Sequence, residues 1–233
     1  MNNNDMFQLG TFENYKVRGR CKVIKEYEHQ IENFANRLKK PGLGAFMAIL
    51  DDPALIDEPD GVRTSPNQVP GDYAEKNPVE LSEKRFSGIE TSVYRIPTAG
   101  GLTTASKDGA YLEIVHGLDV GSGVRIRWDF LIGESSENDF SLNDFALIDI
   151  IDAKNSTLEH REVLHQTTDI PLGRWSTGWR SFTWRSPKKF KAKIRIVVCN
   201  GYSFSESNPP TLDQLTAARS FPSGLLIDCV SIA

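Results

Sequence analysis

Alternation of apolar and charged residues constrains this chain more than any other feature of its sequence. Residues 123–131 read Gly-Val-Arg-Ile-Arg-Trp-Asp-Phe-Leu, so apolar side chains occupy every second position. Residues 144–151 and 193–199 are two further stretches rich in apolar side chains. A period of two is that of a β-strand with one buried face, and short apolar runs are typical of buried strands. The three stretches therefore predict the central strands of a β-sheet protein.

Shorter strand patterns occupy much of the remaining chain. They are predicted at residues 11–18, 45–50, 92–96, 110–116, 161–166, 178–184 and 224–232. Turn signals separate them, and strands do not alternate with long helical patterns as they do in parallel sheets. The sequence thus predicts an all-β fold, an antiparallel two-sheet jelly-roll β-sandwich with one or two short helices. No composition shift divides the chain, so we expect residues 1–233 to form a single domain.

Helical segments and one long loop interrupt the predicted strands. Apolar residues between positions 24 and 38 recur at spacings of three and four, which predicts a helical insertion at 26–39. Proline at the first turn predicts a short helix at 78–86, and a capping-box pattern predicts another at 211–218. Residues 51–77 carry four prolines and form a predicted loop longer than compact domains usually contain. We expect this loop to serve an interaction.

Charge and hydropathy exclude several classes of function. The formal net charge is −4, so a general nucleic-acid-binding surface is not expected. No apolar run is long enough to predict a membrane span. The first residues lack the basic and apolar regions of a signal peptide, which predicts cytoplasmic synthesis without export, with a virion as the alternative location.

The three cysteines are predicted to be reduced thiols. Cys21, Cys199 and Cys229 form no Cys-x-x-Cys motif, and the last two lie inside apolar strand patterns. Buried free cysteines behave as small apolar side chains. A disulfide between Cys199 and Cys229 is the alternative.

The order of several short motifs resembles that of a known group of proteins. The motifs are Gly10-Thr-Phe-Glu13, Gly44–Leu50, the predicted helix Glu80–Ile89, Arg127–Leu131 before an acidic loop, Asn143–Ala146, Gly178–Phe182 and Gly224–Asp228. Together they cover most of the chain and resemble the jelly-roll ectodomains of secreted bacterial proteins that carry a PEP-CTERM anchor. This chain lacks their signal peptide, Pro-Glu-Pro tail and C-terminal anchor, and it has an additional charged segment at 20–40. The resemblance therefore implies the fold and not the cell-surface role.

Carboxylates near both ends of the chain are candidate metal ligands. Glu13 and Asp228 resemble positions in jelly-roll carbohydrate-binding modules where a Glu after the first strand and an Asp in the last strand share a structural Ca²⁺. Carboxylate and carbonyl oxygens suit this hard cation. Asp144, together with the acidic loop 134–139, is a second candidate. The alternatives are solvated or backbone-bonded carboxylates and, at residues 143–144, an Asx-turn.

Three tryptophans are candidate sugar-binding residues. Trp175, Trp179 and Trp184 lie within ten residues, and exposed indoles on one sheet face would form a stacking platform for sugar rings. However, alternation places Trp179 and Trp184 on opposite faces of the predicted strand, so at least one of them is expected in the core.

Catalytic patterns are weak. His160 and His165 are expected on opposite faces of a strand, and no zinc-ligand spacing or nucleophile-elbow motif accompanies them. Asp129 and Glu134 could pair as glycosidase carboxylates, but acidic β-proteins offer many such pairs. The basic segment 180–193 is expected to be a solvated sheet face with a lysine-rich turn rather than a binding site for an acidic partner. We therefore predict no catalytic residues and no enzymatic activity.

These observations lead to two main functional hypotheses. The first is a non-catalytic structural or interaction protein, such as a capsid-decoration or tail component of a virion, whose partners are other subunits or copies of itself. The second is a lectin-like carbohydrate-binding module that binds glycans and carries a structural calcium ion. A glycoside hydrolase is a third. An exposed coplanar pair of tryptophans would favour glycan binding, whereas buried tryptophans with an exposed apolar patch elsewhere would favour assembly.

Overall fold

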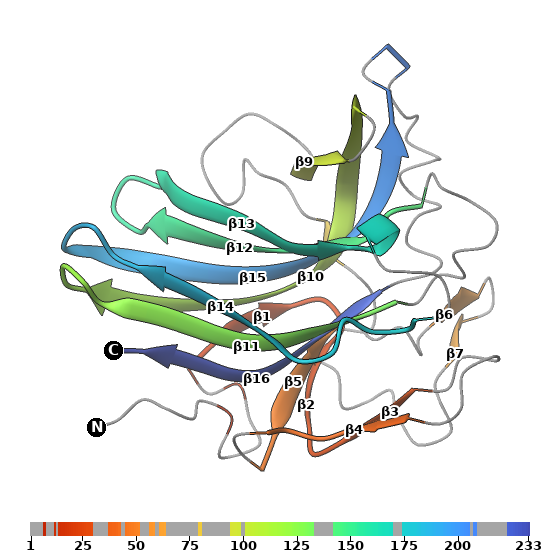
Figure 1. Ribbon diagram of the computed structural model, residues 1–233, viewed down its shortest axis with the longest axis horizontal. Coiled ribbons are helices and arrows are strands. Elements are labelled where there is room, and N and C mark those ends of the chain that lie inside the picture. Colours follow the sequence, from red (N-terminus) through yellow and green to blue (C-terminus); the bar gives the residue numbers. More distant parts are fainter. Residues whose placement is uncertain are drawn as a thin grey trace.

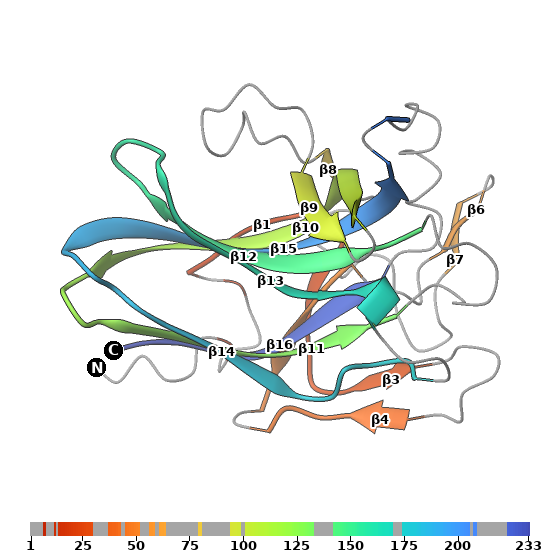
Figure 2. The same ribbon diagram turned by 45° about the horizontal axis from the view of Figure 1, so that its top comes forward.

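A computed structural model gives the fold of the chain. It describes residues 7, 12, 14–29, 37–42, 45–51, 56–58, 61–63, 79–80, 94–98, 101–132, 142–169, 174–205, 207–208 and 223–233. Within these residues two antiparallel β-sheets pack face to face as a sandwich. Figure 2 shows them as separate layers, with β15, β12 and β13 above and β14, β11 and β16 below.

Sheet A is the larger layer. Its strands run in the order β1-β10-β15-β12-β13, and β8 and β9 also pair with β10. Their bounds are β1 Lys16–Arg18, β8 Val79–Glu80, β9 Tyr94–Thr98, β10 Leu102–Leu118, β12 Phe145–Asp152, β13 Leu158–Gln166 and β15 Phe190–Phe204. A register shift between Ser106 and Asp108 divides β10. On the N-terminal side of this shift, β10 pairs with β9 and with the C-terminal end of β15, and these three segments rise out of the layer (Figure 1).

Sheet B has five strands in the order β14-β11-β16-β5-β2. Their bounds are β2 Cys21–Ile24, β5 Met47–Leu50, β11 Gly123–Leu131, β14 Arg180–Arg185 and β16 Gly224–Ile232. Two small hairpins complete the described strands: β3 Tyr27–His29 with β4 Arg37–Lys39, and β6 Ile56–Glu58 with β7 Gly61–Arg63. One 3-10 turn at Thr167–Asp169 follows β13. Within the described ranges no helix is both long and apolar enough to cross a membrane.

The main hydrophobic core lies between the two sheets. On β11 the side chains of Val124, Ile126, Trp128 and Phe130 are buried there, which confirms the predicted alternation. Alternate residues of β10, β12 and β15 approach them from sheet A. Burial of this apolar surface is the principal force that holds the layers together.

Sheet A also buries apolar side chains on its outer face. This second cluster contains Tyr94, Ile96, Tyr111, Phe145, Leu147, Val197 and Cys199. The strands β12 and β15 are consequently buried on both faces, which explains why residues 144–151 and 193–199 are so rich in apolar side chains.

A row of charged residues crosses the outer face of sheet A. Glu113, Arg195, Asp149 and Arg161 are cross-strand neighbours on β10, β15, β12 and β13. Arg195 Nε donates to Glu113 at 3.0 Å, and Arg161 donates to both oxygens of Asp149 at 2.7 and 2.9 Å. The first three side chains are almost fully buried. Each buried charge therefore depends on its partner.

The outcomes for the predicted helices differ from the sequence analysis. A continuous helix at 26–39 is wrong, because β3 and β4 occupy both of its ends; residues 30–36 lie outside the described residues. The helical spacing at 24–38 instead reflects a hairpin that buries Tyr27 against sheet B. Residues 79–80 are a strand where a helix was predicted, and the predicted loop at 51–77 contains the β6–β7 hairpin. The predicted helix at 211–218 lies outside the described residues.

Two smaller expectations have clear outcomes. The three cysteines form no disulfide, in line with the predicted reduced thiols; all three are buried, and Cys199 and Cys229 belong to different sheets. The histidine prediction is wrong, because His160 and His165 both face the core: His160 contacts Phe182, and His165 contacts Phe130. The β12–β13 register shifts by one residue between them, which reverses the expected side of His165.

The charged row predicts a large effect of a single substitution. We expect Arg195→Met to lower the free energy of unfolding by about 3–5 kcal/mol, because Glu113 would remain buried without its cation. Urea unfolding followed by circular dichroism would measure the change. Lys154→Met in the exposed β12–β13 turn is the control and should change stability by less than about 0.5 kcal/mol. Equal effects of the two substitutions would contradict this role of the row.

Candidate functional site

The outer face of sheet B combines aromatic and charged side chains contributed by segments far apart in the sequence. An apolar cluster of Tyr27, Met47, Ile49, Leu131, Trp175 and Leu226 lies on this face, and Ile24 and Trp179 pack against it. The β3–β4 hairpin and residues 174–179 bring Tyr27 and the two tryptophans onto strands β2, β5, β11 and β16. We call this surface the sheet B outer face.

The first charged pair on this face joins β4 to β11. Lys39 Nζ lies 2.5 Å from Asp129 Oδ2 and 4.9 Å from the centre of the Trp175 ring. The Asp129 carboxylate is fully buried, and its other oxygen accepts a hydrogen bond from the Thr177 hydroxyl at 3.2 Å. Lysine, carboxylate and indole thus form one contact group.

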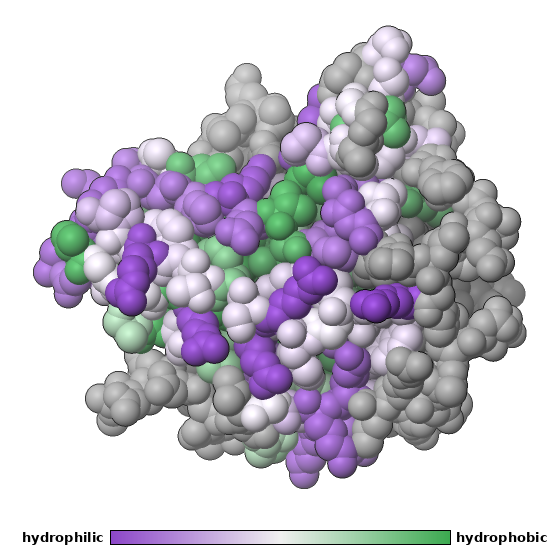
Figure 3. Space-filling view, viewed as in Figure 1, coloured by the Kyte–Doolittle hydropathy of each residue, from purple (hydrophilic) through white to green (hydrophobic). Residues whose placement is uncertain are grey.

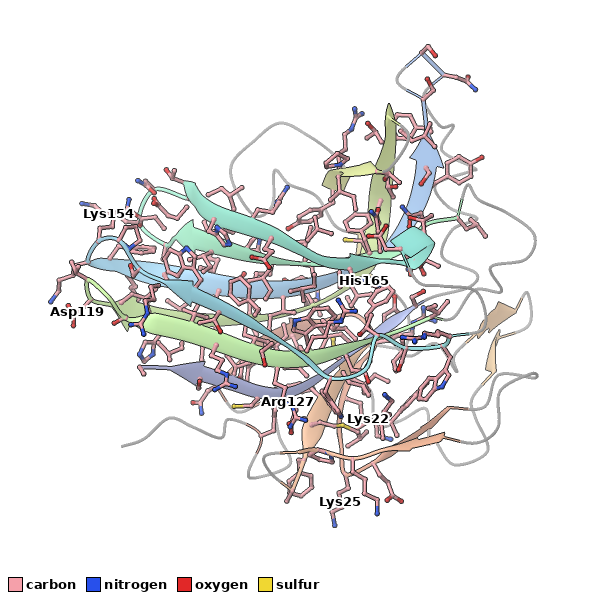
Figure 4. The ribbon with its side chains drawn as sticks, viewed as in Figure 1. Lys22, Lys25, Asp119, Arg127, Lys154 and His165 are labelled. Atoms are coloured by element: carbon pink, nitrogen blue, oxygen red, sulfur yellow. The ribbon has the colours of Figure 1, made fainter. Side chains whose placement is uncertain are left out.

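A second pair repeats the arrangement two residues earlier on β11. Arg127 Nη1 donates to Asp228 Oδ2 at 2.7 Å, and the guanidinium lies 4.9 Å from the centre of the Trp179 ring. The backbone N–H of Gly42 donates to the same carboxylate oxygen at 3.0 Å. A β-carbon at Gly42 would lie 1.8 Å from Arg127 Nη1, so a larger residue at this position would displace the guanidinium. Figure 4 labels Arg127 beside β11.

The structure separates the three candidate tryptophans. Trp175 is 4% exposed and Trp179 is half-buried, and both belong to the sheet B outer face. Trp184 packs against the core from the opposite side of β14 and lies 6.0 Å from His160, ring centre to ring centre. The predicted opposition of Trp179 and Trp184 is therefore correct. Of the three tryptophans, only Trp179 remains a candidate for stacking on a sugar ring, because Trp184 packs on the core and Trp175 is buried under Lys39 of the β3–β4 hairpin.

The candidate metal ligands occupy different places. Asp228 is paired with Arg127, whereas Asp144 is buried at the start of β12, and Glu13 lies outside the described residues. Among the described side chains, no group of three or more His, Cys, Asp or Glu residues could hold a metal ion. The calcium site stays a prediction.

Asp144 accepts hydrogen bonds from three separate segments of the chain. Its two side-chain oxygens accept the backbone N–H groups of Gly201 at 2.9 Å and Ser223 at 2.6 Å. Its carbonyl oxygen accepts the N–H of Thr167 at 2.8 Å. Burial raises the pKa of Asp144 to about 8, although the two N–H donors act in the opposite direction. The negative charge of Asp51, which is paired with Arg20, adds to the rise in this pKa.

Sequence reasoning missed the cationic partners of this face. The sequence places Lys39 in a predicted helix and Arg127 on the polar face of an alternating strand, and it considers Asp129 only as that polar face or as a glycosidase carboxylate beside Glu134. The available signal was Asp228, a charged residue within the apolar stretch 224–232, because buried carboxylates require a partner.

Known proteins show only remote similarity to this chain. No family model and no curated protein matches this chain. Similar solved structures include the enzymatically active domain of bacteriophage CBA120 tailspike protein 4, with a TM-score of 0.39 and 10% identity. This chain is covered completely in that match but spans only 21% of the tailspike chain.

Two further matches are carbohydrate-binding modules. TmCBM61 in complex with β-1,4-galactotriose has a TM-score of 0.38 and 12% identity, with coverage of 100% of this chain and 98% of that one. A CBM4 structure has a TM-score of 0.32 and 11% identity over 67% of this chain and 86% of that one. With TM-scores below 0.5, function has to be derived from the residues of this chain. The resemblance to PEP-CTERM ectodomains stays a prediction.

The environment of Asp144 predicts a pH dependence of stability. An aspartate in the unfolded chain titrates near pH 4, whereas folded Asp144 holds its proton to about pH 8. The folded state thus binds more protons in this window, so the free energy of unfolding should fall as the pH rises from about 4 to about 8. Asp144→Asn should flatten this dependence.

Chemical denaturation of both proteins at several pH values would measure the effect. Burial lowers the pKa of His165, which acts in the opposite direction, but His165 is common to both proteins and cancels in their difference. Parallel stability curves for the two proteins would contradict the assignment to Asp144.

Proposed function

We propose that this chain is a non-catalytic carbohydrate-binding β-sandwich that contacts a glycan through Trp179 and Arg127 on the sheet B outer face. The observation that carries the proposal is a half-buried indole held against a guanidinium at 4.9 Å. An indole fixed in this way can offer an apolar surface to the C–H groups of a sugar ring.

Arg127 supplies the polar part of such a contact. It is 25% exposed, and Asp228 engages Nη1, which leaves other guanidinium N–H groups to donate to sugar hydroxyls. The buried carboxylate of Asp228 also fixes the orientation of the guanidinium. A side chain held in place before binding loses less conformational entropy when the ligand arrives.

The carboxylates of this face support binding rather than hydrolysis. A glycosidase requires one carboxyl that donates a proton and a second that attacks the sugar or activates water. Here Asp129 contacts Lys39 and Thr177, and Asp228 contacts Arg127 and the Gly42 N–H. Both are occupied by donors within the protein. The alternative glycosidase partner Glu134 lies outside the described residues.

The hypothesis of an assembled particle has less support among the described residues. Large apolar side chains that are exposed are Leu102, Val115, Val120, Leu158 and Val163. On the outer face of sheet A, Lys193 lies between Val115 and Leu158, and Arg161 lies between Leu158 and Val163. Assembly through a continuous apolar patch would require these side chains to adjoin. The virion role stays a prediction, which light scattering of the purified protein tests.

The proposed function predicts the behaviour of a tryptophan series. A glycan array should identify ligands of the wild-type protein, and isothermal calorimetry should then show about tenfold weaker binding for Trp179→Ala, equivalent to about 1.4 kcal/mol. Trp179→Phe keeps an aromatic ring and should retain most of the affinity.

The control is His116→Ala. His116 is half-buried on β10 of sheet A, and this variant should bind as the wild type does. Unfolding curves would establish that all three variants are folded. Absence of any glycan ligand, or full affinity of folded Trp179→Ala, would refute the proposed function.

A further inference from the structure

We infer that the glycan is an anionic polysaccharide, bearing carboxylate or sulfate groups, that lies along β11 and β14 over a row of arginines. This inference rests on the proposed function, because it specifies the ligand of the same face. The row consists of Arg185 on β14 and Arg125 and Arg127 on β11.

Strand register places the three arginines on one side of sheet B. Gly123 pairs with Arg185, Arg125 with Thr183, and Arg127 with Ser181. Directly paired residues of antiparallel strands project to the same face. The intervening Val124 and Ile126 are buried in the core, so the arginines project from the opposite, outer face. They advance along the strand by two residues at a time, or about 7 Å per step.

The arginines differ in their partners. Arg125 and Arg185 are exposed, and no ion pair with either of them is found among the described residues; Arg185 donates only to the Gly121 carbonyl, at 3.2 Å. Arg127 is paired with Asp228 but stays partly exposed beside Trp179. Two exposed cations with no ion-pair partner among the described residues thus lie on the same face of sheet B as Trp179, further along the strands.

The two carboxylates on the outer face of β11 and β16 are withdrawn from solvent. Asp129 and Asp228 are buried, and each is paired with a cation. Small hydroxyl residues lie between the arginines: Thr183 and Ser181 on β14, and Ser231 opposite Arg125 on β16. Figure 3 shows hydrophilic side chains standing apart over these strands, with side chains of intermediate hydropathy between them. The outer-face side chains described on β11, β14 and the end of β16 thus combine arginines with hydroxyl groups.

This arrangement favours an acidic polysaccharide over other anions. An extended acidic glycan offers negative groups at regular intervals, hydroxyls for the serine and threonine side chains, and ring C–H surfaces for Trp179. Arginine binds carboxylate and sulfate oxygens through paired N–H groups. The formal net charge of −4 disfavours a long nucleic acid, whose backbone would extend beyond this small basic face. The positive charge is thus confined to a small face, which matches a single glycan chain lying along two strands.

The experiment compares polysaccharides that differ only in charge. Affinity electrophoresis and calorimetry would be run with polygalacturonate and its fully methyl-esterified form, and with chondroitin sulfate and desulfated chondroitin. We expect the wild type to bind at least one acidic form at least tenfold more tightly than its neutralised counterpart. We also expect added salt to weaken the tighter binding.

Variants assign the charge preference to the arginine row. Arg125→Gln with Arg185→Gln should lower the affinity for the acidic form at least tenfold and leave binding of the neutralised form within about twofold of wild type. The matched control removes two exposed cations elsewhere, Lys154→Gln with Lys191→Gln, and should retain the preference. Both pairs of substitutions are on the surface, and unfolding curves would verify that they fold.

The outcomes separate this inference from the proposed function. Equal binding of acidic and neutralised forms, or a preference that survives loss of Arg125 and Arg185, would overturn the inference while glycan binding stands. Failure to bind any of the four polysaccharides, with glycans on the array also unbound, would overturn both. Equally tight binding of double-stranded DNA or polyglutamate would show a general polyanion surface and would also overturn the inference.

Discussion

Burial of both faces of the central strands is the constraint on which the rest of the structure depends. The strands β12 and β15 contact the core with one face and the outer cluster of sheet A with the other. Any polar group in them must find a partner within the protein, because water is excluded. The ion pair of Asp149 with Arg161 and the backbone contacts of Asp144 meet this requirement.

The same rule produces the candidate site on the other sheet. Asp129 and Asp228 are buried among apolar side chains, so each holds a cation, and each cation lies over an indole. Pairing thereby orders Lys39 and Arg127, which would otherwise be flexible surface side chains. A structural need to neutralise buried carboxylates has the consequence of presenting Trp179 and a guanidinium in a fixed arrangement, which is what binding of a sugar requires.

The sequence predicted long strands better than short elements or distant contacts. Residues 123–131 and 224–232 coincide with β11 and β16, because nine residues of consistent pattern leave little ambiguity. The helix predicted at 26–39 is wrong, because three-residue strands are too short to show a period of two and the apolar spacing matched that of a helix. Arg127 with Asp228 and Lys39 with Asp129 are separated by 101 and 90 residues. Such pairs depend on sheet order, which no local pattern encodes.

The central claim is that glycans bind at the sheet B outer face, and the most direct measurement is a nuclear magnetic resonance titration that follows the four tryptophan indole N–H signals. On addition of an acidic oligosaccharide, the signal of Trp179 should shift most, with a smaller shift for Trp175 beneath the hairpin. The signals of Trp128 and Trp184, which face the core, should stay in place. A titration that shifts Trp184 and leaves Trp179 unchanged would contradict the account.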